Sequence, residues 1–179
     1  MKRRICVFCG ARPGRNGIYL QIARDAARSI AAHGYGIVYG GGRVGMMGAL
    51  ADGALAAGAE IVGVIPEALA AAEVAHSGIT QLHVVESMHA RKAMLERLSD
   101  AFIALPGGIG TMDELFETLT WRQLRIHDKP VGILNVDGYY DPLVKLLDRM
   151  LAEGLLPQAT RNLVTARASI EEILDAFAF

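Results

Sequence analysis

Short, uninterrupted apolar segments alternate along this chain with longer segments of helical periodicity, and this alternation constrains the fold more than any other feature of the sequence. Typical apolar segments are IVGVI at 61–65 and AFIAL at 101–105. Such runs predict strands that are covered on both faces, as in parallel sheets connected by helices. We therefore expect an α/β fold in a single domain over residues 1–179, with a Rossmann-like, doubly wound parallel sheet flanked by helices.

The expected strands are Arg4–Cys9, Gly36–Tyr39, Ile61–Ile65, Gln81–Val85, Ala101–Leu105 and Pro130–Leu134. The expected helices are Ile18–His33, Met46–Ala57, Ser87–Leu98, Thr111–Arg125 and Asp141–Glu153. Glycines 34, 58 and 154 each follow one of these helices, where glycine commonly ends a helix. Residues 66–80 form the longest irregular connection, and long loops in compact domains often carry function.

The charge and hydropathy of the chain exclude several classes of protein. The 179 residues include 18 Lys and Arg against 19 Asp and Glu, which gives a formal net charge of −1. Nucleic-acid-binding proteins usually carry a clear basic excess, so we expect no nucleic-acid partner. No apolar stretch is long enough to span a bilayer, and the apolar run 5–9 is too short for a signal peptide. We expect a cytoplasmic protein with no membrane partner.

Cys6 and Cys9 form a C-x-x-C, a spacing that can indicate redox chemistry or half of a zinc site. Both cysteines lie on the first expected strand, where residues three apart point to opposite faces. The chain has no other cysteine to complete a metal site. We therefore expect Cys6 to pack in the core and Cys9 to have a role at the strand end, each as a small apolar side chain, and we expect no metal.

Two glycine-rich turns each follow an expected strand and open a helix, at the edge where parallel sheets bind ligands. The first turn, GGGRVG at 40–45, fits G-x-G-x-x-G, whose bare backbone can approach a phosphate. A nicotinamide-dependent oxidoreductase would also need an acidic residue about twenty positions on, and Glu67 could serve. Alternatively, these glycines serve only close packing between the strand and the helix.

The second turn, PGGIGTMDE at 106–114, is more informative. Its amides should form another anion site at a helix N-terminus. Two such sites in one small domain call for two anionic groups, or for one nucleotide lying across both. Thr111 and Glu114 also fit a capping box, in which the threonine caps the helix and the glutamate bonds back to it. Capping alone would account for Glu114.

PGGIGTMDE is similar to the PGG-x-GT-x-x-E signature of the LOG (Lonely Guy) family, and MHARK at 88–92 resembles that family's M-H-x-R-K motif. The likeness runs through most of the chain, in segments such as VFCGARPG, YGGGRVGMMG and TWRQLRIHDKPVGILNVDGYY. Ala11 stands where serine is common in the family, and Arg125 where glycine is common. Residues 66–80 look least like the family.

The resemblance implies a phosphoribohydrolase that cleaves cytokinin riboside 5′-monophosphates, or AMP, into the free base and ribose 5-phosphate without a cofactor. It also implies a homodimer, with Arg91 and Glu114 as the catalytic residues. The substrate contacts that we expect from the family and from the two turns are Gly41, Gly42, Glu73, Met88, Arg91, Lys92, Gly107, Gly108, Ile109, Gly110, Thr111, Met112, Asp113 and Thr120.

The implied chemistry has a simple physical basis. Breaking an N-ribosyl bond builds positive charge on the sugar, which a nearby carboxylate can stabilise while it orients the attacking water. We expect Glu114 to act in this way, and Arg91 either to polarise the departing base or to anchor the phosphate.

Two other functions compete with this hydrolysis. A non-catalytic carrier of a nucleotide or of the molybdenum cofactor would share the architecture and the glycine-rich turns. Relatives have also been labelled lysine decarboxylases, which need a lysine that carries pyridoxal. For Lys92, a charge clamp beside the second turn is the simpler role.

Overall fold

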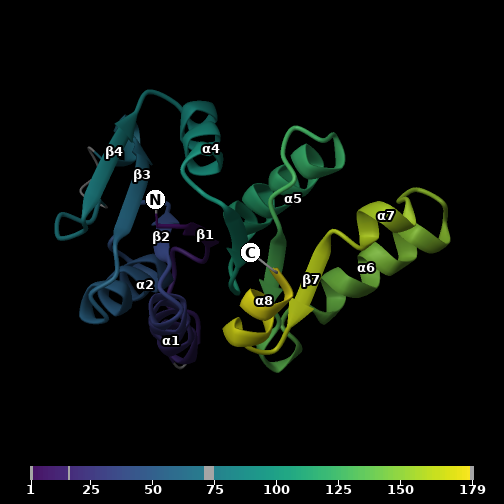
Figure 1. Cartoon of the computed structure of the whole chain (residues 1–179), viewed down its shortest axis with the longest axis horizontal. Coiled ribbons are helices and arrows are strands. Elements are labelled where there is room, and N and C mark those ends of the chain that lie inside the picture. The colour runs from purple at the N-terminus through teal and green to yellow at the C-terminus, as the bar shows by residue number, and fades with distance from the viewer. Residues whose placement is uncertain (1, 16, 71–74, 178–179) are drawn as a thin grey trace.

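The computed structural model describes residues 2–15, 17–70 and 75–177. Seven parallel strands form one sheet in the order β4-β3-β2-β1-β5-β6-β7 (Figure 1). The strands are β1 (Arg4–Phe8), β2 (Gly36–Tyr39), β3 (Ile61–Pro66), β4 (Gln81–Val85), β5 (Ala101–Ala104), β6 (Val131–Leu134) and β7 (Val164–Arg167). The helices are α1 (Ile18–Ala32), α2 (Gly45–Ala56), α3 (Glu67–Ala70), α4 (Met88–Arg97), α5 (Ile109–Gln123), a 3-10 turn η1 (Val136–Gly138), α6 (Asp141–Ala152), α7 (Gln158–Arg161) and α8 (Ile170–Phe177).

The sheet is doubly wound, as expected. From β1 the chain builds the sheet outward through β2, β3 and β4, then returns to place β5 on the other side of β1. Helices α1, α2 and α8 pack on one face of the sheet, while α4 and α5 pack on the other (Figure 1). The strand order therefore reverses between β1 and β5, which is where such sheets open a crevice for a ligand.

The two faces of β1 show why its sequence is apolar without interruption. Ile5 and Val7 belong to the core beneath α1 and α2, whereas Cys6 and Phe8 belong to the core beneath α4 and α5. Cys9 lies with the first group, so the two free cysteines face opposite sides of the sheet. Burial raises the pKa of both thiols well above the ordinary range. Cys6 is confirmed as a core residue, and Cys9 lies buried directly after the end of β1, where it also lines a cavity.

Every expected strand and helix is present, with each end within two residues of its expected position. Five elements were not expected: α3, η1, α7, β7 and α8. The strand β7 has the half-polar sequence VTAR and lies at the edge of the sheet, only partly buried, so its pattern is not that of a central strand. Helix α3 lies in the connection that we expected to be irregular.

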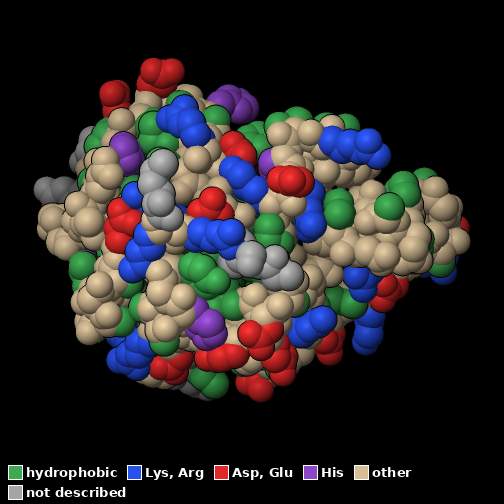
Figure 2. Space-filling model, viewed as in Figure 1, with side chains coloured by type: hydrophobic (Ala, Val, Ile, Leu, Met, Phe, Trp, Pro, Cys, Tyr) green, Lys and Arg blue, Asp and Glu red, His purple; other side chains and the backbone are tan. Residues whose placement is uncertain are grey.

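The surface carries a mixture of charges. Basic and acidic side chains are interspersed over the face seen in Figure 2, in keeping with the net charge of −1. Within the described residues, no helix combines the length and the apolar character needed to cross a membrane.

Candidate active site

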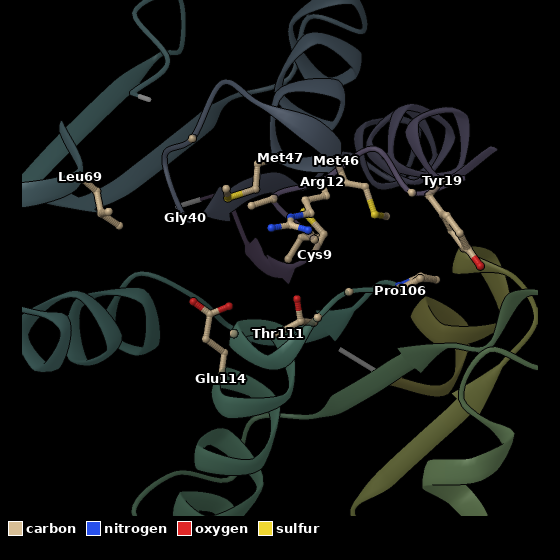
Figure 3. A pocket seen from close by; sticks show the side chains of 18 of the residues that line it. Cys9, Arg12, Tyr19, Gly40, Met46, Met47, Leu69, Pro106, Thr111 and Glu114 are labelled. Atoms are coloured by element: carbon tan, nitrogen blue, oxygen red, sulfur yellow. The ribbon is translucent and has the colours of Figure 1, made fainter. Parts of the chain in front are cut away.

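A cavity of about 560 Å³ lies at the carboxyl ends of the central strands. Its walls come from the turn after β1, the turn after β2, the start of α2, residue 91 of α4 and the turn that opens α5. Figure 3 shows Cys9, Gly40, Met46 and Thr111 around this cavity. The cavity thus occupies the point where the strand order reverses. Its volume lies within the range of pockets that hold small organic ligands.

An ion pair between Arg91 and Glu114 lies in the wall of this cavity. Nη1 of Arg91 donates to Oε1 of Glu114 at 2.5 Å, and the two side chains are only 10% and 11% exposed. Nε of Arg91 also donates to the carbonyl of Val64 at 3.1 Å, so the guanidinium is held from two sides. Burial raises the pKa of Glu114, although the charge of Arg91 opposes the shift. The carboxyl therefore titrates above the usual range of glutamate.

Local structure explains how Arg91 reaches this position. Ser87 caps α4, with its hydroxyl accepting from the N–H of Ala90 at 3.1 Å, and Arg91 follows one turn later. Gly40, at the end of β2, leaves room for the guanidinium: a Cβ there would lie 2.4 Å from Nη2 of Arg91. The space that the Arg91 side chain needs therefore explains the glycine at position 40 without any bound ligand.

The N-terminus of α5 presents free backbone amides to the cavity. The helix begins at Ile109 after Gly108, with no side-chain cap. The N–H of Met112 donates to the carbonyl of Gly108 at 3.1 Å, so the three preceding N–H groups have no partner within the helix. Together with the helix dipole, such amides favour an anion. Gly108, Gly110 and Thr111 line the cavity beside them.

The expected capping box is wrong. Thr111 lies in the first turn of α5 and not at its cap, because the helix begins two residues earlier than expected. Glu114 points across to Arg91 on α4 instead of back to its own helix. Capping therefore does not explain Glu114, because its carboxylate accepts a hydrogen bond from Arg91 in the cavity wall.

The first glycine-rich turn has a different character. Its helix α2 uses the N–H of Met46 to donate to the carbonyl of Gly10 at 3.1 Å, so that amide is occupied. Gly41, at φ +76°, packs against Ile65 and Leu82. A Cβ on Gly45, at φ +59°, would lie 2.3 Å from the carbonyl oxygen of Ala11. Close packing explains these glycines, and Gly42 lines the cavity whereas Gly41 does not.

Seven of the fourteen expected site residues that the structure describes line the cavity. Those that line the cavity are Gly42, Arg91, Gly107, Gly108, Gly110, Thr111 and Glu114. Those described but outside its lining are Gly41, Met88, Lys92, Ile109, Met112, Asp113 and Thr120. Met88 and Ile109 are exposed to solvent, and the Thr120 hydroxyl donates to the carbonyl of Phe116 at 2.7 Å. Glu73 lies outside the described residues.

Lys92 is engaged beside the cavity and not within it. Its ammonium lies 2.8 Å from Asp113 and 3.3 Å from Glu117. Burial lowers the pKa of Lys92, but the hydrogen bonds to these two carboxylates outweigh burial and raise it. A lysine that forms a Schiff base must lose its proton readily, so this environment does not suit a pyridoxal-bearing residue.

The acidic residue that a nicotinamide site would need is also misplaced. Glu67 is the first residue of α3, is exposed, and does not line the cavity. The G-x-G-x-x-G turn follows the second strand of the sheet and not the first. The geometry therefore gives no support to the oxidoreductase interpretation.

One wall of the cavity comes from residues that the motifs do not identify. Cys9, Arg12 and Gly14, in the turn after β1, line it together with Tyr19 and Tyr139. Figure 3 shows Cys9, Arg12 and Tyr19. The hydroxyl of Tyr139 donates to the carbonyl of Gly107 at 2.6 Å, and its ring meets that of Tyr19 edge to face. The available signal was the segment CGARPG directly after a central strand, at the same sheet edge as the two glycine-rich turns.

Comparisons with known proteins identify the family of this chain. A family model described as "possible lysine decarboxylase" matches residues 47–177. The chain is 50% identical to a cytokinin riboside 5′-monophosphate phosphoribohydrolase of Rhodococcoides fascians, over 96% of this chain and 87% of the relative. It is 47% identical to a probable enzyme of the same name from Oryza sativa subsp. japonica, over 96% of this chain and 77% of the relative.

Solved structures share the fold. The molybdenum cofactor binding protein of Rippkaea orientalis is 25% identical, with a TM-score of 0.73 over 99% of this chain and 96% of that one. The molybdenum cofactor carrier protein of Chlamydomonas reinhardtii is 23% identical, with a TM-score of 0.73 over 98% and 96%. At nearly full length the sequence is far closer to the phosphoribohydrolases than to either molybdenum cofactor protein. The chain therefore belongs to the LOG family of cytokinin riboside 5′-monophosphate phosphoribohydrolases.

Proposed function

We propose that this protein hydrolyses the N-glycosidic bond of a cytokinin riboside 5′-monophosphate, or of AMP, and releases the free base and ribose 5-phosphate. The observation that carries the proposal is the buried Arg91–Glu114 ion pair, which lies in the cavity wall next to the free amides of α5. A carboxylate and an anion site side by side suit a ligand that has a sugar attached to a phosphate.

In the proposed reaction the bond between ribose C1′ and the base nitrogen breaks, and the base departs with the electron pair. Water supplies a hydroxyl group to C1′, and the proton that it releases balances the one that the base takes up. Glu114 stabilises the positive charge on the sugar and orients this water. The amides of Ile109, Gly110 and Thr111 hold the 5′-phosphate.

Arg91 fits a role in holding Glu114. Its Nε and Nη1 are engaged by Val64 and Glu114, and the side chain is almost fully buried. This fixed position favours an arginine that orients the carboxylate and presents its remaining N–H groups to the leaving base or to the phosphate. The other expected contacts, from Gly41, Glu73, Met88, Lys92, Met112, Asp113 and Thr120, remain part of the proposal.

A homodimer and a cytoplasmic location also belong to this proposal. Met88 on α4, Phe116 on α5 and Leu124 at the end of α5 expose apolar side chains, which a second subunit could cover. Light scattering would measure the mass in solution. Both cysteines are free thiols, in keeping with a reducing compartment.

The test is release of the base from AMP and from isopentenyladenosine 5′-monophosphate, with Glu114→Gln as the decisive variant. Gln can still accept a hydrogen bond from Arg91 but cannot carry the negative charge, so kcat should fall by about 10²–10⁴. The free energy of unfolding should change by less than about 1 kcal/mol, because Gln avoids the cost of burying the Glu114 charge, which offsets the loss of the ion pair.

Glu60→Gln is the matched control, because Glu60 forms an ion pair with Arg4 at the opposite end of β1, with 2.7 Å between Nη2 and Oε1. This variant should retain wild-type kcat. If wild-type protein binds both nucleotides and releases the base from neither, the carrier interpretation holds instead. If Glu114→Gln keeps kcat within a few-fold of wild type, the assignment of Glu114 fails.

A further inference from the structure

The charges that line the cavity do not balance. Its charged lining residues, among those described, are Arg12, Arg91 and Glu114. Arg91 and Glu114 neutralise each other in their ion pair. No residue in the described parts of the chain forms an ion pair or hydrogen bond with the side chain of Arg12. Among the described lining residues one positive charge is therefore uncompensated, which favours an anionic ligand.

The backbone that carries Arg12 is held firmly at the centre of the sheet edge. The N–H of Gly10 donates to the carbonyl of Pro106 at 3.3 Å, and the carbonyl of Gly10 accepts from Met46. The turn also packs so closely on Gly45 that a Cβ there would lie 2.6 Å from the N atom of Arg12. The turn after β1 thus contacts both glycine-rich turns, and these contacts fix the backbone position of Arg12.

The Arg12 side chain enters the cavity opposite the start of α5. Figure 3 shows its guanidinium in the hollow near Cys9 and Met47, with the Thr111 hydroxyl and the Glu114 carboxylate on the facing wall. A phosphate at the N-terminus of α5 would have backbone amides on one side and the guanidinium on the other. Arginine suits this geometry, because its planar N–H groups bind phosphate oxygens in pairs.

We infer that Arg12 binds the 5′-phosphate of the substrate and thereby makes the enzyme select nucleoside monophosphates over nucleosides. This inference rests on the proposed function for its substrate, but phosphate binding itself does not require turnover. Arg12 acts in binding, whereas Glu114 acts on the sugar. Loss of Arg12 should therefore change KM for the monophosphate and leave kcat largely intact.

The experiment compares Arg12→Ala and Arg12→Lys with Arg15→Ala, a control that removes the same charge from the same turn outside the cavity lining. Initial rates are measured on isopentenyladenosine 5′-monophosphate and on isopentenyladenosine. Binding of ribose 5-phosphate is measured by calorimetry. For Arg12→Ala we expect KM for the monophosphate and Kd for ribose 5-phosphate to rise about 10- to 100-fold, with kcat changed less than about threefold. Arg12→Lys should recover part of the loss.

The nucleoside arm separates phosphate binding from other roles. For isopentenyladenosine, kcat/KM should be the same in wild type and Arg12→Ala, because this substrate has no phosphate for Arg12 to bind. An equal loss on both substrates would place Arg12 at the base or sugar and overturn the inference, as would Arg12→Ala behaving like Arg15→Ala. If wild-type protein releases no base but Arg12→Ala still weakens ribose 5-phosphate binding, the inference stands and the proposed hydrolysis fails.

Discussion

The two glycine-rich turns look alike in sequence and differ in what their glycines do. In the turn after β2, Gly40 makes room for Arg91 and Gly45 for the backbone of Ala11, so these glycines accommodate other parts of the protein. In the turn after β5, a Cβ on Gly108 or Gly110 would meet nothing within 4 Å, and the amides that follow Gly108 are free within the helix. One turn supports the site and the other presents backbone to a ligand.

Gly45→Ala and Gly108→Ala should show this difference most strongly in stability. Gly45 has φ +59°, and an added Cβ would lie 2.3 Å from the carbonyl oxygen of Ala11, so we expect a loss of about 3 kcal/mol or more in unfolding free energy. Gly108 has φ −92° and open space, so its substitution should cost less than about 1 kcal/mol. Urea denaturation measures both, and equal losses would contradict the distinction.

Gly40→Ala tests whether the first turn supports catalysis through Arg91. The new Cβ would lie 2.4 Å from Nη2 of Arg91, and moving that guanidinium disturbs its ion pair with Glu114. We expect kcat to fall about 10- to 100-fold, since small displacements of catalytic groups are costly. Gly42→Ala is the control, because its Cβ meets the flexible end of Met47 at 2.6 Å. The comparison fails if Gly42→Ala is the more damaging of the two.

The pH dependence of kcat/KM tests whether the carboxylate of Glu114, which follows the second glycine-rich turn, must be ionised for activity. Burial raises the pKa of Glu114 above the ordinary value of 4.5, while Arg91 opposes the shift. Because the ionised carboxylate is the active form, activity should decline as pH falls through a midpoint above 4.5. The contribution of Glu114 to the free energy of unfolding changes with pH in the opposite direction to activity. It is greatest below pH 4.5 and is lost as pH rises through the raised pKa.

Glu60→Gln again supplies the control for the pH profile. The hydrogen bond from Arg4 lowers the pKa of Glu60, so this carboxyl cannot produce an acid limb above 4.5. The limb should persist in Glu60→Gln and be absent from the residual activity of Glu114→Gln. A limb that survives in Glu114→Gln would belong to another group.

The smallest effect is expected at the far end of α5. Arg125, which stands where the family commonly has glycine, adopts φ +60° just after the helix, and the N–H of Ile126 donates to the carbonyl of Trp121 at 2.9 Å. Arg125→Gly should raise the free energy of unfolding by about 0.5–1 kcal/mol through relief of this left-handed conformation. Arg125→Ala keeps the strained backbone and should not stabilise. Thermal unfolding of both variants decides the point.

The sequence predicted the architecture well because each central strand is buried on both faces. Segments such as IVGVI and AFIAL are apolar at every position, so they are easily recognised as buried strands. Their expected ends lie within a residue of those observed. The edge strand β7 and the helices α3 and α7 escaped prediction for the converse reason. They are short and only partly buried, so local composition carries little of their pattern.

The candidate site was predicted less completely than the fold. The motifs identified Arg91 and Glu114, and the structure joins them in an ion pair. They also suggested a capping box, which the start of α5 at Ile109 rules out, and a ligand role for glycines that the structure uses largely for packing. Arg12 was not singled out, because an arginine in a turn is usually solvated.

By itself, the sequence determined the doubly wound sheet, the positions of its central elements and the family of the protein, because these follow from periodicity and from motifs contiguous in the chain. Only the tertiary structure decided which residues meet. Glu114 faces Arg91 from 23 positions away, and Arg12 enters the same cavity from a turn that precedes both. These contacts depend on how the carboxyl ends of separate strands are placed next to one another in the sheet. No local sequence pattern indicates that placement.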